Sequence, residues 1–169
     1  MRTWYDVFST KWGWIGAIAS DEGLRHMSLP EQSTDLAIRH LAKPLEREKP
    51  QESKKAFDEL QLQLDAYFSG QAEMPQPRLD LEGATKFFRN VWDACRSIPA
   101  GETQTYLWLA EKAGSPKAVR AAGQAMARNR VPLIIPCHSV IGRDGGLHGF
   151  AGPGIGMKAR LLELEGVER

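Results

Sequence analysis

The feature that most constrains the fold is an interruption at residues 71–77, which contain Pro75 and Pro77. Proline has a fixed φ and no backbone N–H, so two of them in a short stretch interrupt helices and sheets alike. The residues before and after this stretch differ in pattern and in charge. The sequence therefore predicts two domains, residues 1–77 and residues 78–169. A chain of 169 residues can bury a core without disulfide bonds.

The first part combines strand and helix patterns. Three short apolar or alternating runs separated by turn residues predict an antiparallel hairpin or three-stranded meander: residues 4–9, 14–20 and 23–29. Helical spacing follows at residues 33–43 and 53–68, the latter with Leu60 and Leu64 on its apolar face. We therefore expect two helices packed on a small sheet, an α/β (α+β) fold.

The second part is predicted to be mainly helical. Residues 85–97 carry apolar side chains at helical spacing, which places Cys95 in the core: Phe88, Val91, Trp92 and Cys95. A second helix should run through Lys112 with Thr103 or Thr105 as its cap. A third is predicted over residues 117–128, with Ser115 as its N-cap. Two short helices joined by a glycine-containing turn are typical of a helix–turn–helix.

Charge also divides the chain. The formal net charge is only +1, but residues 1–82 carry 10 basic and 14 acidic side chains, whereas residues 83–160 carry 11 basic and 4 acidic ones. A solvated basic face is the ordinary explanation for such an excess. Because the basic segment also holds a candidate reactive cysteine, we favour a polyanionic partner, and nucleic acid in particular.

The pair Cys137–His138 is the strongest candidate for chemistry. It follows residues 131–135, which are predicted as a strand that Pro136 ends. A neighbouring imidazole can activate a thiol, whose ordinary pKa of ~8.5 leaves it mostly protonated at neutral pH. The alternative is a buried cysteine beside a histidine satisfied by a backbone carbonyl. On this pair alone both interpretations remain open.

The remaining features indicate the cellular setting. The second cysteine, Cys95, lies at an unrelated position and no Cys/His cluster occurs, which argues against a disulfide framework or a zinc site and favours a reducing compartment. No apolar signal segment opens the chain, and no stretch approaches the ~20 apolar residues that span a bilayer. We therefore expect a soluble cytoplasmic protein without membrane partners.

Residues 84–166 contain several motifs in a fixed order, among them Pro99-Ala100-Gly101-Glu102-Thr103, Arg120-Ala121-Ala122-Gly123, Asn129, Pro136-Cys137-His138, Gly149-Phe150 and Glu165. In this order and spacing the segment resembles the methylated-DNA–protein-cysteine methyltransferases, or O6-alkylguanine-DNA alkyltransferases. The resemblance implies DNA repair by irreversible, stoichiometric transfer of the alkyl group to Cys137, with no cofactor or metal. It implies a ribonuclease H-like N-terminal domain, a monomer and double-stranded DNA containing O6-alkylguanine as the partner. It leaves O4-alkylthymine repair and cooperative binding open.

The same resemblance assigns roles to individual residues. Glu165, at the end of a helix predicted over residues 158–165, orients His138, which deprotonates Cys137 through a water. Tyr106 donates a hydrogen bond to the leaving base or its phosphate, and Asn129 buttresses the active-site turn. Arg120 intercalates where the target nucleotide is flipped out, and further DNA contacts fall on Thr103, Tyr106, Ala121, Gly123 and Arg128. The base pocket is expected to be lined by Val140, Phe150, Ala151 and Gly152.

Four positions depart from the family pattern. Ser139 replaces a common arginine, Arg130 replaces a common proline, Ala151 stands where some relatives have serine, and Pro153 lies in a loop with one extra residue. Two other classes remain as alternatives. A non-catalytic sensor of alkylated DNA would lack the reactive cysteine that is present here. A cysteine hydrolase or redox protein would need turnover, and no second cysteine lies near Cys137 in the sequence.

Overall fold

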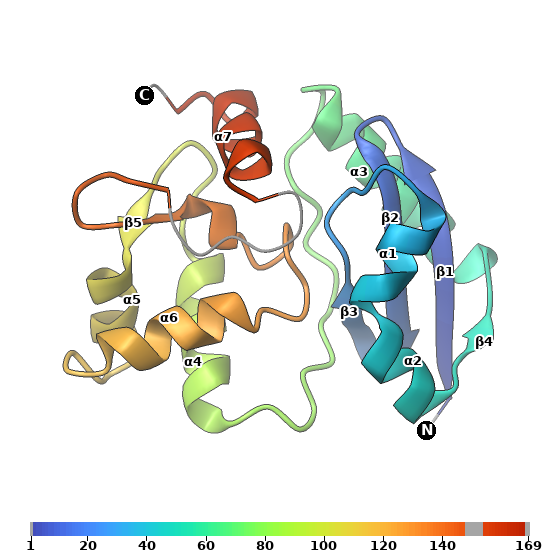
Figure 1. The fold of residues 1–169 in the computed structure, drawn as a ribbon, viewed down its shortest axis with the longest axis horizontal. Helices are drawn as coiled ribbons and strands as arrows, with labels where there is room; N and C mark the ends of the chain where they lie inside the picture. Colours follow the sequence, from blue (N-terminus) through green and yellow to red (C-terminus); the bar gives the residue numbers. More distant parts are fainter. Residues whose placement is uncertain (1, 148–153, 168–169) are drawn as a thin grey trace. The chain divides into compact units, whose positions relative to one another are not determined.

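The computed structural model describes residues 2–147 and 154–167, which divide into two compact units (Figure 1). The first unit consists of Met1–Leu81 together with Arg130–Ile134, and the second of Glu82–Asn129 together with Ile135–Arg169. A sheet flanked by helices forms the first unit, and the second is mainly helical. The predicted mixed α/β fold is therefore confirmed. The domain boundary after residue 77 stays a prediction.

The sheet of the first unit has the strand order β3-β2-β1-β4. The three predicted strands are present as an antiparallel meander: β1 (Thr3–Thr10), β2 (Gly13–Ser20) and β3 (Gly23–Met27). The fourth strand, β4 (Gln51–Glu52), pairs parallel with β1. We did not predict β4, because a strand of two residues is too short to show any alternation.

Helices cover both faces of this sheet. In the β1–β2 ladder Phe8 pairs with Ile15, and Val7 with Gly16, so these two pairs face opposite sides. On one side Phe8 stacks on Phe57, with ring centroids 6.4 Å apart. On the other, a Cβ at Gly16 would lie 2.9 Å from the Leu41 side chain, so glycine lets the helices approach closely.

The predicted helix over residues 33–43 is wrong in one respect, because the chain forms two helices there. These are α1 (Thr34–His40), capped by Ser33, and α2 (Ala42–Glu48). Pro44 explains the break, since it has no N–H to donate back into a continuous helix but is tolerated in a first turn. The second predicted helix is confirmed as the 3₁₀ helix η1 (Lys55–Phe57) followed by α3 (Asp58–Phe68).

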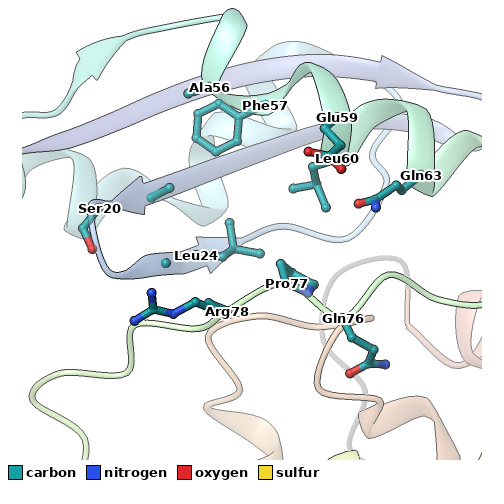
Figure 2. Close-up of a pocket in the computed structure, with 12 residues that line it drawn as sticks. Ser20, Leu24, Ala56, Phe57, Glu59, Leu60, Gln63, Gln76, Pro77 and Arg78 are labelled. Atoms are coloured by element: carbon teal, nitrogen blue, oxygen red, sulfur yellow. The ribbon is translucent and has the colours of Figure 1, made fainter.

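Residues 78–80, which lead toward the second unit, are hydrogen-bonded to β3. The amide of Leu24 donates to the Arg78 carbonyl and the amide of Asp80 to the Leu24 carbonyl, both at 2.9 Å. The Arg25 guanidinium bonds Asp80 and Glu48, each at 2.7 Å. A cavity of about 520 Å³ lies beside this segment, and Leu24 and Pro77 are among its lining residues (Figure 2). Among the described residues assigned a role in catalysis or DNA binding, none lines it.

The second unit is built on three helices that pack on one another: α4 (Lys86–Arg96), α5 (Tyr106–Lys112) and α6 (Val119–Ala127) (Figure 1). The predicted face of α4 is confirmed, since Val91, Trp92 and Cys95 are buried. The indole Nε1 of Trp92 donates to the Ala125 carbonyl at 2.9 Å and so ties α4 to α6. Thr105, one of the two predicted caps, accepts from the amide of Trp108 at the start of α5.

Two predictions for the second half of the sequence are wrong. Helix α6 begins at Val119 without a side-chain cap, because Ser115 instead closes a turn in which its carbonyl accepts from the Ala118 amide. Residues 131–135 are not a continuous strand, since Leu133 has φ +78° and the chain turns there. No helix within residues 2–147 or 154–167 has both the length and the apolar character needed to cross a bilayer.

Candidate active site

Cys137 lies on a tight turn near the start of the second stretch of sequence in the second unit, which resumes at Ile135. It is the first residue of the 3₁₀ helix η2 (Cys137–Ser139), whose residues are all buried. Cys137 itself is 8% exposed. The strand β6 (Val140–Ile141) follows directly and pairs parallel with β5 (Gln104–Thr105). Because β5 leads into α5, this ladder fixes the cysteine turn against the start of that helix.

The histidine beside the cysteine is paired with a carboxylate. His138 Nε2 lies 2.9 Å from Glu165 Oε2, and the two side chains are 1% and 5% exposed. Glu165 follows the last helix, α7 (Ile155–Leu164), as its C-cap, and α7 packs against η2. A carboxylate at Nε2 favours the tautomer with its hydrogen on that nitrogen, which would leave the Nδ1 lone pair available as an acceptor. Nδ1 is buried and has no hydrogen-bond partner among the described residues.

The thiol itself is held in its protonated form. Burial raises the pKa of Cys137 to about 11, although the Asn129 side chain, Lys158 and the backbone amides of Cys137 and His138 act in the opposite direction. Asn129 also donates from Nδ2 to the Ile135 carbonyl at 2.8 Å. This residue therefore supports the turn on both sides of Pro136. At neutral pH the free protein holds a thiol that needs a base in order to react.

A pH profile of thiol alkylation tests this state. Below a pKa of about 11 the thiolate fraction rises with pH, so we expect the iodoacetamide reaction of Cys137 to accelerate about tenfold per pH unit from pH 7 to 9. Peptide mass spectrometry would separate Cys137 from Cys95. A rate that already reaches a plateau near pH 7 would show that the free protein holds a thiolate.

Two further side chains surround the thiol. Tyr106 is the first residue of α5, and its pKa is raised by burial and, to a lesser extent, by Cys137 and Cys95. Its ring lies over α6, because a Cβ placed on Gly123 would meet Tyr106 Cδ1 at 4.0 Å. Cys95 in α4 is fully buried, as predicted for a core residue, and burial raises its pKa well above the ordinary value.

The residues predicted to contact DNA lie on or near α6. Arg120 on α6 and Arg128, its C-cap, are exposed. Ala121 and Gly123, both on α6, are half-buried. Thr103 is half-buried just before β5. Phe150, Ala151 and Gly152, predicted for the base pocket, lie outside the described residues, as does Pro153. The fourth pocket residue, Val140, is buried directly after η2.

The structure adds one residue to which the sequence assigned no role. Lys158 in α7 is 1% exposed, and its Nζ donates to the Val140 carbonyl. A lysine in a predicted terminal helix gives no sign of burial, because most such lysines extend into solvent.

Two of the positions that depart from the family pattern are also described by the structure. Ser139 is buried in η2, and Arg130 belongs to the first unit, where its carbonyl accepts a hydrogen bond from the Met27 amide at 2.9 Å.

Comparison with known proteins gives consistent matches. Residues 86–167 match the family described as "6-O-methylguanine DNA methyltransferase, DNA binding domain". A methylated-DNA–protein-cysteine methyltransferase of Methanosarcina barkeri is 41% identical over 162 residues, or 96% of each chain. A protein of the same name from Mycobacterium leprae is 49% identical over 110 residues, 65% of this chain and 66% of that one. The crystal structure of Mycobacterium tuberculosis O6-methylguanine methyltransferase matches with a TM-score of 0.80 at 36% identity, covering 96% of this chain and 92% of that one. A structure of the M. tuberculosis protein in complex with DNA matches with a TM-score of 0.78 at 36% identity, over 96% of this chain and 92% of that one.

Proposed function

The chain belongs to the family of methylated-DNA–protein-cysteine methyltransferases, and we propose that it repairs DNA by taking the alkyl group of O6-alkylguanine onto Cys137. The observation that carries this assignment is the buried turn on which Cys137 adjoins the His138–Glu165 pair. The protein acts once, because the thioether product is stable. The alternative of a non-catalytic sensor is not favoured, since Cys137 is present and the relatives are named as methyltransferases.

The proposed reaction is a displacement at carbon. His138, oriented by Glu165, takes the proton of Cys137 through a water, and the thiolate then attacks the alkyl carbon. The sulfur–carbon bond forms as the carbon–O6 bond breaks, and the bonding electrons pass to the guanine. The departing base takes up one proton, which balances the one that His138 removed from Cys137, and Tyr106 is the proposed donor of a hydrogen bond to that base. Asn129 holds the turn through its bond to the Ile135 carbonyl. No metal or organic cofactor is required by this scheme.

The DNA-binding surface is proposed to be a helix–turn–helix formed by α5 and α6. The packing of these two helices on each other and the exposure of Arg120 and Arg128 support this proposal. The small side chains at Ala121 and Gly123 allow DNA to approach the α6 backbone, and Thr103 and Tyr106 are proposed as further DNA contacts. Arg120 enters the base stack in place of the flipped nucleotide, which offsets part of the unstacking cost of a few kcal/mol.

The remaining parts of the proposal concern organisation. We propose a ribonuclease H-like N-terminal domain over residues 1–77 and a catalytic domain over residues 78–169, and the division into compact units supports two domains. The base pocket is proposed to include Val140, Phe150, Ala151 and Gly152. The protein is proposed to act as a cytoplasmic monomer on double-stranded DNA.

Mass spectrometry of the reacted protein tests the function directly. The full chain would be incubated with a duplex containing a single O6-methylguanine, and its intact and peptide masses recorded. We expect one methyl group per protein, located on Cys137, and no further increase with excess DNA. Unmodified protein that still binds the lesion would support the sensor alternative, and repeated turnover would exclude a single-use mechanism.

A substitution of Arg120 separates base flipping from chemistry. We expect Arg120→Ala to slow repair of O6-methylguanine in duplex DNA by at least about tenfold, because unstacking then loses its compensating contact. Reaction with free O6-benzylguanine should change by less than about twofold, since no base has to be flipped. Single-turnover rates on both substrates provide the measurement. Equal losses on the two would contradict the role assigned to Arg120.

A further inference from the structure

The cavity beside residues 76–78 has no part in the proposed reaction and is far larger than a packing defect. Its volume is about 520 Å³. Small-molecule sites occupy roughly 300–1,000 Å³, whereas protein interiors contain few voids larger than a water molecule. The cavity lies between η1 and α3 on one side and β2, β3 and residues 76–78 on the other (Figure 2). All of these elements belong to the first unit, so the cavity is a feature of that unit alone.

Both walls of the cavity are held in place without a ligand. On the α3 side, Gln61 Nε2 donates to the Ser9 carbonyl of β1 at 2.7 Å. On the opposite side, residues 78–80 are hydrogen-bonded to β3. Their close approach requires Gly23, where a Cβ would lie 2.5 Å from the Arg78 carbonyl oxygen. Because each wall is fixed to the sheet separately, the space between them is preformed, which lowers the cost of binding.

The floor of the cavity is apolar. Leu24, Phe57 and Leu60 line it and are buried. Figure 2 shows Leu60 extending from α3 toward Leu24 of β3 and Pro77 of the opposite wall. Burial of apolar surface is the main favourable contribution to association in such a space. The floor therefore favours a ligand with an apolar body.

The rim of the cavity adds a charge. Five of its lining residues are exposed: Ala56, Glu59, Gln63, Gln76 and Arg78. The Arg78 charge is compensated in part, since its Nη2 lies 3.4 Å from Glu22 Oε2. The Glu59 carboxylate has no hydrogen-bond or ion-pair partner among the residues that the structure describes. The uncompensated charge at the rim is therefore negative.

The surrounding charges have the same sign. Residues 1–82 carry 10 basic and 14 acidic side chains, so the field of this part of the chain disfavours an anionic ligand, DNA phosphate included. Gln63 lies one helical turn after Glu59 on α3 and beside it in Figure 2, where its amide oxygen can accept from the same donor. A carboxylate and an amide oxygen at the mouth of an apolar space suit an ammonium group.

We propose that the cavity between α3 and residues 76–78 binds an amphiphilic organic cation. Its apolar body lies against Leu24, Leu60 and Pro77, and its ammonium group lies at Glu59. This site is separate from alkyl transfer, because it is lined by none of the described residues assigned to catalysis or DNA contact. The floor supplies the affinity, and the carboxylate selects the sign of the ligand's charge.

Three probes of similar shape and different charge test the proposal. The full chain would be titrated with phenethylammonium, 2-phenylethanol and 3-phenylpropionate, and amide shifts followed by ¹H–¹⁵N NMR. We expect shift changes centred on the lining residues. Because exposed ion pairs are partly screened, the dissociation constant of phenethylammonium should be about threefold lower than that of the alcohol and about tenfold lower than that of the carboxylate. Added salt should reduce this preference.

A pair of substitutions on α3 isolates the charge. Glu59→Gln should weaken phenethylammonium binding about threefold and leave 2-phenylethanol binding unchanged. Asp58 is the matched control, since it is an exposed acid of the same first helical turn that does not line the cavity. Asp58→Asn should bind all three probes like the wild type.

A second pair isolates the apolar space. Ala56→Phe fills the cavity from an exposed position and should abolish binding of all three probes there. Leu62 is 72% exposed on α3 but does not line the cavity, so Leu62→Ala should have no effect. Circular dichroism and thermal unfolding would establish that each variant keeps the fold.

Several results would overturn the proposal. Among them are the absence of shift changes at the lining residues and a folded Ala56→Phe protein that binds the probes as before. Equal binding of the three probes, or a preference for 3-phenylpropionate, would exclude selection of a cation by Glu59. The proposed function is tested separately, because Glu59→Gln should still accept one methyl group from O6-methylguanine DNA.

Discussion

Replacement of Cys137 by serine is expected to abolish alkyl transfer while lesion-containing DNA is still bound. Serine is nearly isosteric with cysteine, so the buried turn should be preserved at a residue that is only 8% exposed. A hydroxyl is a far weaker acid than a thiol, and burial makes its ionised form still less accessible. We therefore expect no methyl transfer above background in a mass-spectrometric assay, and binding within about threefold of wild type by fluorescence anisotropy.

The matched control for this substitution is the other cysteine of the chain. Cys95 is buried in α4 and belongs to the core, so Cys95→Ala should retain stoichiometric transfer. Loss of transfer in both variants would point to a general disruption of the second unit. Methylation that persists in a folded Cys137→Ser protein would assign the acceptor to another residue and would remove the basis of the proposed function.

The second large effect is expected at Glu165. Its carboxylate lies 2.9 Å from His138 Nε2 in an environment where both side chains are almost fully buried. Glu165→Gln removes the charge that orients the imidazole and stabilises its protonated form after it takes the thiol proton. Hydrogen bonds to charged groups contribute roughly 1.5–3 kcal/mol, so the single-turnover rate on O6-methylguanine DNA should fall on the order of 10- to 100-fold.

Glu163 provides the control for this experiment. It lies on the same helix, is exposed and carries the same charge, so Glu163→Gln should transfer at the wild-type rate. DNA binding should be unchanged in both variants, because the effect is assigned to proton removal. A folded Glu165→Gln protein that reacts as fast as the wild type would contradict the proposed role of the carboxylate. A loss of DNA binding would instead indicate a structural role.

Local patterns were sufficient for much of the fold. Alternation and turn residues predicted the three strands of the meander, and helical spacing predicted the buried face of α4, including Cys95. Errors arose where local rules competed. Pro44 divided a predicted helix, Ser115 closed a turn instead of capping α6, and the apolar residues 131–135 turned at Leu133 although their composition favours a strand.

The residues of the candidate site also differ in how far the sequence could identify them. Cys137 and His138 are adjacent in the sequence, so their chemistry was visible as a motif, and their resemblance to a known family supplied Glu165, Tyr106 and Asn129. The DNA-contacting and pocket residues taken from that resemblance stay predictions. Lys158 also belongs to the residues that carry the resemblance, but no role was assigned to it, because neither spacing nor residue type shows that a lysine on a terminal helix is buried.

The sequence by itself determined the short-range features of this protein: the three strands of its meander, most of its helices and the reactive cysteine–histidine pair. Only the tertiary structure decided how close distant groups come to that pair and how deeply they are buried. Glu165 reaches His138 across 27 positions, and Lys158 reaches the Val140 carbonyl across 18. The physical reason is that burial and electrostatic environment depend on how elements pack. A side chain's partners, and therefore its charge state, are properties of that packing and not of neighbouring residues.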